Sequence, residues 1–325
     1  MFGTTRDRNE AADLAAVGQA AAGPPVVGEL PAAEAGPDRS PFLYRWLNRP
    51  VFRRRWVPKG RAWTVLAVAF LLLVLGWATV PSVFTGGSPT AVNPLATLLH
   101  PSASYPLGTD QYGRSVYTEL VYGARSALAV GVFSTLLGGT VGSMIGIIGG
   151  YLGGWVDMLV MRLIDILLAL PGIFLALIFV AALPRTLPNE ILAVAISIVP
   201  VFARVLRGQA LQVRSRLYVD AATVVGVPGR TIVWRHVLPN CLAPAVVLGA
   251  ISIGTAIVIG ASLNFLGLGP SEKIQDWGAL ISDGQAYINR DWWISTFPGL
   301  VVTLVVIAVS ILGDRLRDAM EPSSG

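Results

Sequence analysis

Charged residues are scarce in this sequence, and cysteine and histidine are almost missing. Only 13% of the 325 residues are charged, about half of the share usual in a soluble protein. The single cysteine, Cys241, excludes an internal disulfide and a metal site built from several thiolates. We expect the two histidines, His100 and His236, on opposite sides of a membrane, and we therefore expect no metal site.

Motifs for binding ATP and for catalysis are also missing. The chain has no G-x-x-x-x-G-K-[ST] phosphate loop, which indicates that it does not bind ATP by that mechanism. It has no G-x-S-x-G, H-E-x-x-H or paired-cysteine motif. We therefore expect no catalytic residue, no enzyme activity and no cofactor in this chain. If ATP drives its function, another chain supplies the energy.

Long hydrophobic runs dominate what is present, since 54% of the residues are hydrophobic. Several runs are long enough to cross about 30 Å of hydrocarbon as helices. We predict an all-α, polytopic membrane protein with six transmembrane helices, at roughly 62–80, 126–150, 156–182, 189–206, 237–263 and 297–313.

The distribution of basic residues predicts the orientation. Most lysines and arginines fall before the first span, between residues 204 and 235, and near the C-terminus, so we expect both termini in the cytoplasm. That topology predicts outer loops at 81–125 and 264–296 and a cytoplasmic loop at 207–236. The net charge of +5 then reflects loops at a membrane surface rather than nucleic-acid binding.

The first 61 residues differ from the rest of the chain. Residues 1–40 are rich in Ala, Pro and Gly, which predicts a disordered cytoplasmic tail. Residues 41–61 interleave basic residues with Phe and Trp, which is typical of a segment that lies on membrane lipid. Residues 62–322 then form the membrane domain.

A row of small residues marks the second predicted span. The row repeats every four residues and therefore forms one ridge on a helix, where another helix can approach closely. We expect it to serve internal packing, with a sliding surface for a partner or a gate as the alternative. Its members are Ser134, Gly138, Gly142, Gly146, Gly150 and Gly154.

Charged residues inside the third predicted span require a partner. An unpaired Asp near the centre of a span costs about 2.5–3.5 kcal/mol. Arg162 and Asp165 lie three residues apart, so we expect them to pair and to face the bundle. A place in a translocation path is the alternative for Asp165. Pro171 and Gly172 predict a kink, either passive or acting as a hinge.

The loop predicted at 264–296 is rich in charge. We expect its charged side chains to be solvated, with attraction of amino groups near a mouth as the alternative. Trp292 and Trp293 predict a membrane interface. The charged residues are Glu272, Asp276, Asp283 and Asp291, with Lys273 and Arg290.

The segment 218–240 predicts a short helix, a break and a return to the membrane. Asp220 falls in the first turn, where a carboxylate suits the helix dipole. Gly226 and Pro228 predict the end of the helix. A narrow apolar stripe at i, i+3, i+4 and i+7 suits insertion into the groove of another protein, with an ordinary amphipathic loop as the alternative. The stripe consists of Tyr218, Ala221, Ala222 and Val225.

This segment resembles the EAA loop of permease subunits of bacterial ABC importers. The Glu-Ala-Ala, Gly and Leu-Pro pattern of that loop stands here as Asp220-Ala221-Ala222, Gly226 and Leu238-Pro239. Asp replaces the usual Glu, which keeps the charge and shortens the side chain. The resemblance implies coupling to a cytoplasmic ATPase through Tyr218, Asp220, Ala221, Ala222, Val225, Gly226, Arg235, His236 and Pro239.

The first outer loop carries a second resemblance. Gly108 and Gly113 permit tight turns, and Asp110 and Arg114 are spaced to pair and brace them. The run 105–115 is similar to HPLGTD-x-x-GRD in the C-type permease of dipeptide and oligopeptide importers, with Tyr105 for His and Ser115 for Asp. Similarity extends from about residue 45 to 322. It implies docking of an extracytoplasmic binding protein on Gly108, Thr109, Asp110, Gly113 and Arg114.

Together the resemblances imply a type I ABC importer permease in the bacterial plasma membrane. The implied partners are a homologous second permease, two ATPase chains that bind ATP and Mg²⁺, an extracytoplasmic substrate-binding protein and membrane lipid. The implied cargo is di- or oligopeptides, with nickel chelates or glutathione as alternatives. An ion-driven secondary transporter is the alternative of another class, although such proteins usually show internal repeats or several intramembrane ionisable groups. An intramembrane enzyme lacks candidate residues.

Overall fold

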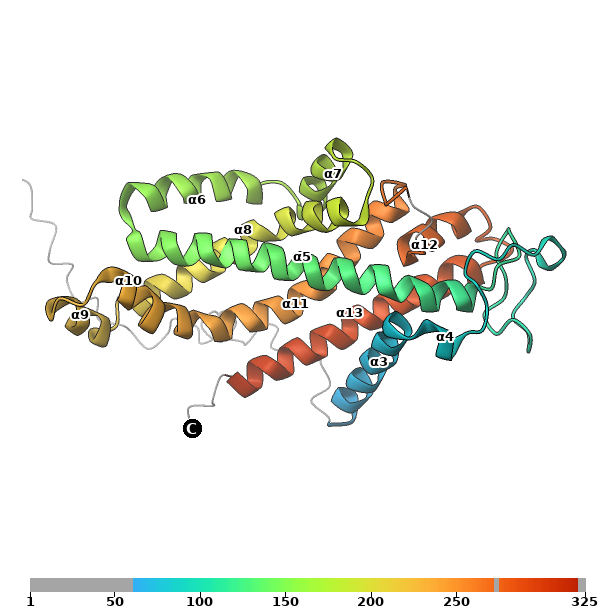
Figure 1. The fold of residues 1–325 in the computed structure, drawn as a ribbon, viewed down its shortest axis with the longest axis horizontal. Helices are drawn as coiled ribbons and strands as arrows, with labels where there is room; N and C mark the ends of the chain where they lie inside the picture. Colours follow the sequence, from blue (N-terminus) through green and yellow to red (C-terminus); the bar gives the residue numbers. More distant parts are fainter. Residues whose placement is uncertain (1–60, 272–274, 321–325) are drawn as a thin grey trace, which may run out of the picture. The chain divides into compact units, whose positions relative to one another are not determined.

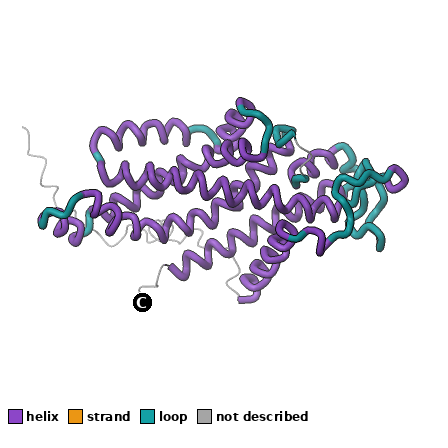
Figure 2. Tube along the Cα trace, in the orientation of Figure 1, coloured by secondary structure: helices purple, strands orange, loops and turns teal. Residues whose placement is uncertain are grey.

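The computed structural model of the chain describes residues 61–271 and 275–320. Within these residues the backbone is almost entirely helical, and the only β pairing is a single bridge between Thr109 and Ser115 (Figure 2). This confirms the predicted all-α fold. The predictions for residues 1–60, for Glu272 and Lys273, and for the end of the chain lie outside the described residues.

Among the described residues, five helical segments are long and apolar enough to cross a membrane. A sixth candidate consists of α6 and α7, which are bent by 90° at the break between them. The count agrees with the six spans predicted from the sequence. The segments are α3 (Arg61–Thr79), α5 (Val116–Leu152), α6 (Gly154–Leu168) with α7 (Gly172–Ala182), α8 (Leu187–Arg214), Gly229–Phe265 and α13 (Trp293–Met320).

Short elements lie at the two ends of the long helices (Figure 1). One end, called the α9 end here, holds α9 (Leu217–Val224) and α10 (Gly229–Ile232). The other, called the α12 end, holds α4 (Pro81–Phe84), the loop up to residue 115 and α12 (Trp277–Gln285). Segment Gly229–Phe265 continues from α10 through a π-helical turn, Val233–Val237, into α11 (Leu238–Phe265).

Several helices extend beyond the apolar runs that predicted them. Helix α5 begins at Val116 rather than near 126, because the Ser115 side chain caps it by accepting from the Thr118 N–H. Helix α8 continues to Arg214, and the fifth helical segment begins at Gly229. The loops are therefore shorter than the predicted 81–125, 207–236 and 264–296, since polar residues continue a helix without adding to its hydropathy.

The third predicted span is broken rather than kinked. Helix α6 ends at Leu168 and α7 begins at Gly172, with a bend of 90° between them. Pro171 explains the break, because its ring disfavours helical geometry in the preceding residue and its nitrogen carries no hydrogen.

Helices α5 and α8 pack along a row that we call the glycine ladder. Ser134 of α5 donates its hydroxyl to the Ile191 carbonyl at 2.9 Å. A Cβ atom at each of the next four small positions would lie closer than 3.0 Å to one carbonyl oxygen of α8. The internal packing predicted for this row is thereby confirmed. The glycine–carbonyl contacts are Gly138 with Ala195, Gly142 with Val199, Gly146 with Ala203 and Gly150 with Arg207.

The predicted sixth member of this row lies outside the ladder. A Cβ atom at Gly154 would meet nothing within 4 Å, and the residue has a φ of +65° at the turn into α6. The four-residue spacing places side chains on one ridge only while the helix continues, and α5 ends at Leu152, before Gly154.

Ion pairs tie α6 to α8, and one prediction is wrong here. Asp157 accepts two hydrogen bonds from Arg207, both at 2.6 Å. Asp165 pairs with Arg204 of α8 instead of Arg162, its neighbour on α6. The expected pair of Arg162 and Asp165 does not form because α6 folds back beside α8, and arginines of α8 face the acids of α6. Asp165 also remains half-exposed rather than enclosed by the bundle, since its side chain is 52% exposed.

We predict that Gly146→Ala destabilises the chain, while Gly208→Ala does not. The added methyl group at Gly146 collides with the Ala203 carbonyl, and overpacking of this kind costs about 1–3 kcal/mol. A Cβ atom added at Gly208 would meet nothing within 4 Å. Alanine there should therefore stabilise the chain by up to about 1 kcal/mol through its higher helix propensity. Thermal unfolding of the purified variants in detergent compares them. Equal midpoints for both variants would contradict the ladder.

Candidate functional site

Helix α9 is anchored on one side and bare on the other. Val219 is 3% exposed and belongs to the main hydrophobic core, together with Ile232 and Val237 of the following turns. Asp220 lies in the first turn, as predicted, and is exposed. The helix therefore has a fixed position against α8 and α11 while most of its surface faces away from the chain.

The end of α9 follows the sequence prediction closely. Gly226 has a φ of +84°, a conformation that favours glycine. Its N–H donates to the Thr223 carbonyl at 3.0 Å, and the Val227 N–H donates to the Ala222 carbonyl at 3.0 Å. These two bonds form a Schellman motif, whose usual apolar contact is present because Ala222 and Val227 both pack on the core.

The exposed apolar residues of α9 differ in part from the predicted stripe. Tyr218 and Val225 are exposed at 43% and 82%, and Ala221 is exposed as well. Ala222 is half-buried in the Schellman contact. Leu217 at 86% and Val224 at 87% were missed, because the stripe was counted from Tyr218 alone. Leu217, Val224 and Val225 are thus almost uncovered within the described chain, whereas Tyr218 is partly covered.

Tyr218 and His236, which the prediction grouped together, are in contact. Their ring centroids are 5.8 Å apart. The Asn240 side-chain amide donates to the His236 carbonyl at 2.6 Å and lies 3.4 Å from the Tyr218 hydroxyl. This cluster joins the start of α9 to the π-helical turn and to α11.

The π-helical turn before α11 has an identifiable cause. The Leu238 N–H donates to the Val233 carbonyl, five residues back. Pro239 has no N–H to offer the Arg235 carbonyl, so the regular four-residue bond is missing at this point. Arg235 and Pro239, two of the predicted coupling residues, are both exposed. Single π turns often mark functional sites in helices.

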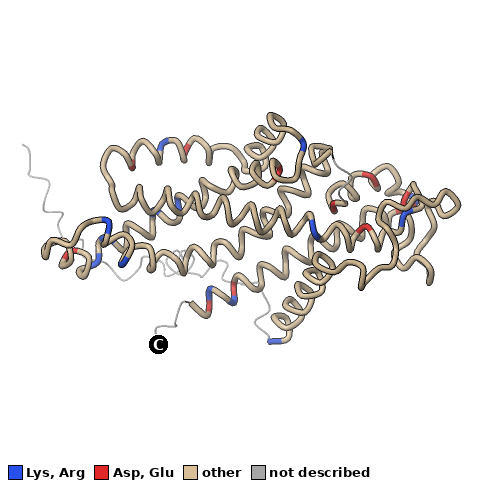
Figure 3. Tube along the Cα trace, viewed as in Figure 1, with Lys and Arg blue, Asp and Glu red and all other residues tan. Residues whose placement is uncertain are grey.

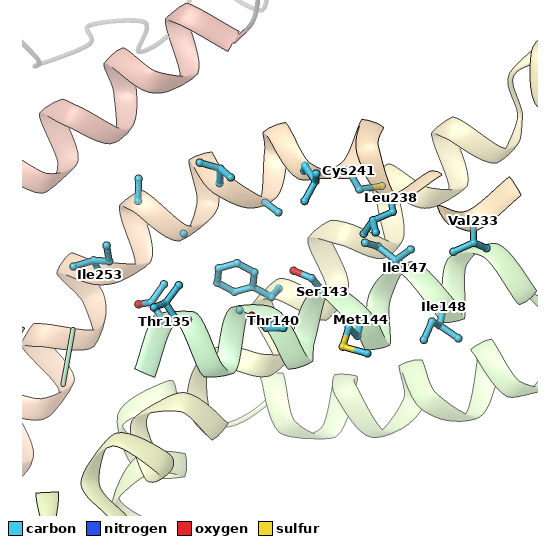
Figure 4. A pocket seen from close by; sticks show the side chains of 18 of the residues that line it. Thr135, Thr140, Ser143, Met144, Ile147, Ile148, Val233, Leu238, Cys241 and Ile253 are labelled. Carbon is cyan, nitrogen blue, oxygen red and sulfur yellow. The ribbon is translucent and has the colours of Figure 1, made fainter. Parts of the chain in front are cut away.

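An apolar groove of about 560 Å³ runs between α5 and α11 (Figure 4). Three hydroxyl side chains of α5 line it, namely Thr135, Thr140 and Ser143. Trp234 and Leu238 line the same groove, so it begins at the π-helical turn. The groove therefore shares residues with the segment 218–240, which is called the coupling segment here because the sequence predicts that it couples to an ATPase. A shift of this turn would therefore change the shape of the groove.

The predicted pair of Asp110 and Arg114 is confirmed at the α12 end. Asp110 Oδ1 accepts from the backbone N–H groups of Tyr112 at 2.9 Å and Arg114 at 2.7 Å. Asp110 Oδ2 accepts from the Arg114 Nε at 2.6 Å. The carboxylate thus closes the 110–114 turn, and Gly113 with a φ of +72° completes it.

Gly108 and Thr109 are held inside the same loop. Thr109 is fully buried, accepts from the Leu99 N–H at 2.8 Å and donates to the Ala96 carbonyl at 2.5 Å. A Cβ atom at Gly108 would collide with the ring of Trp293. These residues therefore hold the loop together, whereas Tyr112 is among the exposed residues beside them. Their predicted role in docking a binding protein stays a prediction.

Arg114 also lies beside two acids that the sequence did not assign to it. Its NH1 lies 3.0 Å from Glu119 Oε1, and its NH2 lies 4.0 Å from Asp283 Oδ2. Glu119 is fully buried. Burial raises the pKa of Asp283, and the Arg114 charge opposes that rise. Three carboxylates thus surround one guanidinium, which no local spacing rule could reveal because Asp283 lies far along the chain.

Three further residues at this end are buried against expectation. Asp276 and Asp291 are 6% and 2% exposed instead of solvated, and Trp293 is 2% exposed instead of lying at a membrane interface. Trp293 donates from its indole nitrogen to the Thr109 carbonyl at 3.2 Å and packs on His100. Asp276 caps α12 by accepting from the Gly278 N–H at 2.7 Å. The exposed Trp292 remains consistent with an interface.

Residues 142–324 match the family described as binding-protein-dependent transport system inner membrane component. The chain is 39% identical over 260 residues to the dipeptide transport system permease protein DppC of Alkalihalophilus pseudofirmus, covering 79% of this chain and 86% of that protein. It is 35% identical over 270 residues to the probable D,D-dipeptide transport system permease protein DdpC of Escherichia coli, covering 83% and 91%.

A third relative carries a different cargo name. The glutathione transport system permease protein GsiD of Pectobacterium atrosepticum is 39% identical over 222 residues, which cover 68% of this chain and 74% of that protein.

We predict that Arg114→Gln strongly destabilises the chain, because it leaves the buried Glu119 without its cation. Breaking a buried pair in this way costs about 3–5 kcal/mol. Arg114→Gln combined with Glu119→Gln should recover part of that loss, measured by thermal unfolding in detergent, because only the buried Asp110 then lacks its cation. Arg125→Gln, which changes an exposed arginine nearby, is the control. A double variant less stable than Arg114→Gln alone would contradict the pairing.

Proposed function

Because this chain belongs to the family of binding-protein-dependent transport system inner membrane components, on the dipeptide and oligopeptide branch of the ABC permeases, we propose that it is one of two transmembrane subunits of an ATP-driven importer of short peptides. The observation that carries the proposal is the bare apolar face of α9. A water-soluble surface rarely leaves such a cluster uncovered, and a cluster of this kind is typical of a site that binds another protein.

The charge distribution supports the orientation that this function needs. Arginines gather towards the α9 end, whereas acidic side chains are found towards both ends (Figure 3). By the positive-inside rule, the excess of arginine supports a cytoplasmic position for the α9 end. Helix α9 would then face the ATPase chains, and the loop around Asp110 would face the extracytoplasmic binding protein.

The contacts of α9 supply a mechanical route from the ATPase to the membrane. Motion of α9 reaches the π-helical turn through Tyr218, His236 and Asn240. That turn lines the groove between α5 and α11. We infer that closure of the ATPase chains on ATP and Mg²⁺ shifts α9, reshapes this groove and opens the path towards the outside. Hydrolysis in the partner chains then resets it.

The groove is our candidate for this subunit's half of the cargo path. It is apolar with a few hydroxyl groups, which suits passage of a peptide without tight binding. The homologous second permease would supply the facing half. Specific recognition would then rest mainly with the binding protein rather than with residues of this chain.

Short peptides are the proposed cargo class. Two relatives are named for dipeptides and D,D-dipeptides, and the third is named for glutathione. Glutathione is itself a small peptide, so it is the second candidate within the same class. Mild-detergent purification of the tagged chain, with mass spectrometry of its partners and of the ligand held by the binding protein, tests both assembly and cargo. Recovery of an active chain without ATPase chains would overturn the proposal.

We predict that Leu217→Asp combined with Val224→Asp abolishes ATPase attachment without unfolding the chain. Burying an exposed side chain of this size contributes about 1.5–3 kcal/mol. Losing two should weaken attachment by at least about 100-fold, since each 1.4 kcal/mol is a factor of ten. The readout is the amount of ATPase chain that co-purifies.

The matched control for this double variant is Leu95→Asp. Leu95 is 95% exposed but lies at the α12 end, so the change should leave ATPase attachment intact. Unfolding temperatures of both variants should stay close to that of the original chain. Full ATPase recovery with the Leu217/Val224 double variant would show that α9 is not the docking element.

A further inference from the structure

A small polar pocket lies at the α12 end, separate from the groove between α5 and α11. Its volume is about 170 Å³. Four side chains that line it come from four different elements and are almost fully buried. They are Ser126 of α5, Glu190 of α8, Asn264 of α11 and Asp276 at the start of α12, with exposures of 4%, 1%, 5% and 6%.

The backbone around this pocket is well defined. Helix α11 ends in a Schellman motif, in which Gly267 donates to the Asn264 carbonyl and Leu268 donates to the Leu263 carbonyl, both at 3.0 Å. Residues 267–271 then pass along the pocket. The Ser271 N–H donates to the Arg185 carbonyl at 2.9 Å, which fastens this turn to the start of α8.

Glu190 receives too few hydrogen bonds in this pocket, and several oxygens share the single hydroxyl of Ser126. The Ser126 hydroxyl lies 2.6 Å from the Gln275 carbonyl, 3.0 Å from the Gly123 carbonyl and 3.2 Å from Asp276 Oδ2. One hydroxyl carries only one hydrogen, so two of these three oxygens receive none from it. The Asn264 amide donates to Glu190 Oε1 at 3.0 Å. Glu190 Oε2 has no partner at all.

No cationic side chain of the described residues pairs with Glu190 or Asp276, the two carboxylates of the pocket. Arg185 lines the pocket, but it is exposed and pairs with neither carboxylate. Burial raises the pKa of Asp276, and its hydrogen bonds from Gly278, Ser126, Ala279 and Asn264 only partly offset that rise. Buried carboxylates normally have a cation beside them.

We propose that this pocket binds one small hard cation, held by Glu190 and Asp276 with the Ser126 hydroxyl and the Asn264 side chain. Oxygen ligands of this kind suit Na⁺, Mg²⁺ or Ca²⁺. The volume accommodates an ion with some of its water, since one water needs only about 10–15 Å³ of such space. The ion would occupy the side of the pocket on which Glu190 Oε2 is unpartnered.

A bound cation would fasten four helices at one point. It would connect α5, α8, α11 and α12 at the end opposite the coupling segment, without contributing to the groove. Its expected effect is therefore on the stability of the α12 end, and it does not depend on the ATPase partners or on the cargo.

Thermal unfolding of the purified full chain in detergent tests this site. NaCl, MgCl₂ and CaCl₂ are titrated in turn, with choline chloride keeping the ionic strength constant. We expect a saturable rise of the unfolding temperature with one of these cations. Removing even an outer-shell partner weakens metal binding about 10–100-fold, so Glu190→Gln should weaken the response by at least about 100-fold.

Two further variants make the outcome decisive. Asp276→Asn should weaken the same response and serves if Glu190→Gln does not fold. Asp165→Asn, which changes an acid of α6 paired with Arg204, should lower the unfolding temperature equally in every salt and keep the cation response. The proposal is overturned if the original chain responds to all salts alike, or if Glu190→Gln keeps the response. A pH-dependent stability without any cation response would assign a proton to the pocket instead.

Discussion

The close approach of α5 and α8 is the constraint on which the rest of the structure depends. Glycine at every fourth position lets carbonyl oxygens of α8 lie where side chains of α5 would otherwise stand. Helices α5 and α8 can slide little past each other at this close approach. Each glycine of α5 faces one carbonyl oxygen of α8, and both recur every four residues. Two helices of 37 and 28 residues thus form one stiff unit.

The position of every functional element follows from this unit. Helix α6 is fixed to its α9 end by the bidentate pair of Asp157 and Arg207. The turn after α8 delivers α9, and Val219 of α9 packs into the core of the same unit. Both α8 and α11 contain an internal proline, at Pro200 and Pro244, but α11 is also preceded by the π-helical turn. Because α11 lacks a row of glycine–carbonyl contacts like the one that joins α5 to α8, we expect the π-helical turn before α11 to yield first.

Rules based on short sequence spacings predicted the features that depend only on residues close together in the chain. Gly226 identified the end of α9, the spacing of Asp110 and Arg114 identified their pair, and the four-residue repeat identified a packing ridge. They did not reveal which helix the ridge meets. The same limit explains the wrong partner for Asp165, since Arg204 lies 39 residues away in the sequence.

Burial of the acids at the α12 end was beyond such rules for another reason. Asp276 is buried because it caps the start of α12, and Asp283 meets Arg114 only because a distant loop folds beside α12. Composition reports that a loop is charged, but it does not report which charges the tertiary structure removes from water.

The two ends of the molecule therefore use polarity in opposite ways. At the α9 end, apolar side chains are left exposed, which is favourable only if another chain covers them. At the α12 end, carboxylates are buried, which is favourable only if donors or cations satisfy them. The first arrangement makes the α9 end dependent on a protein partner. The second leaves the α12 end with two clusters of buried acids, one held by Arg114 and the other short of positive charge around Glu190. We therefore expect motion to begin at the α9 end, where an ATPase would dock, and to reach the α12 end through the long helices that join them.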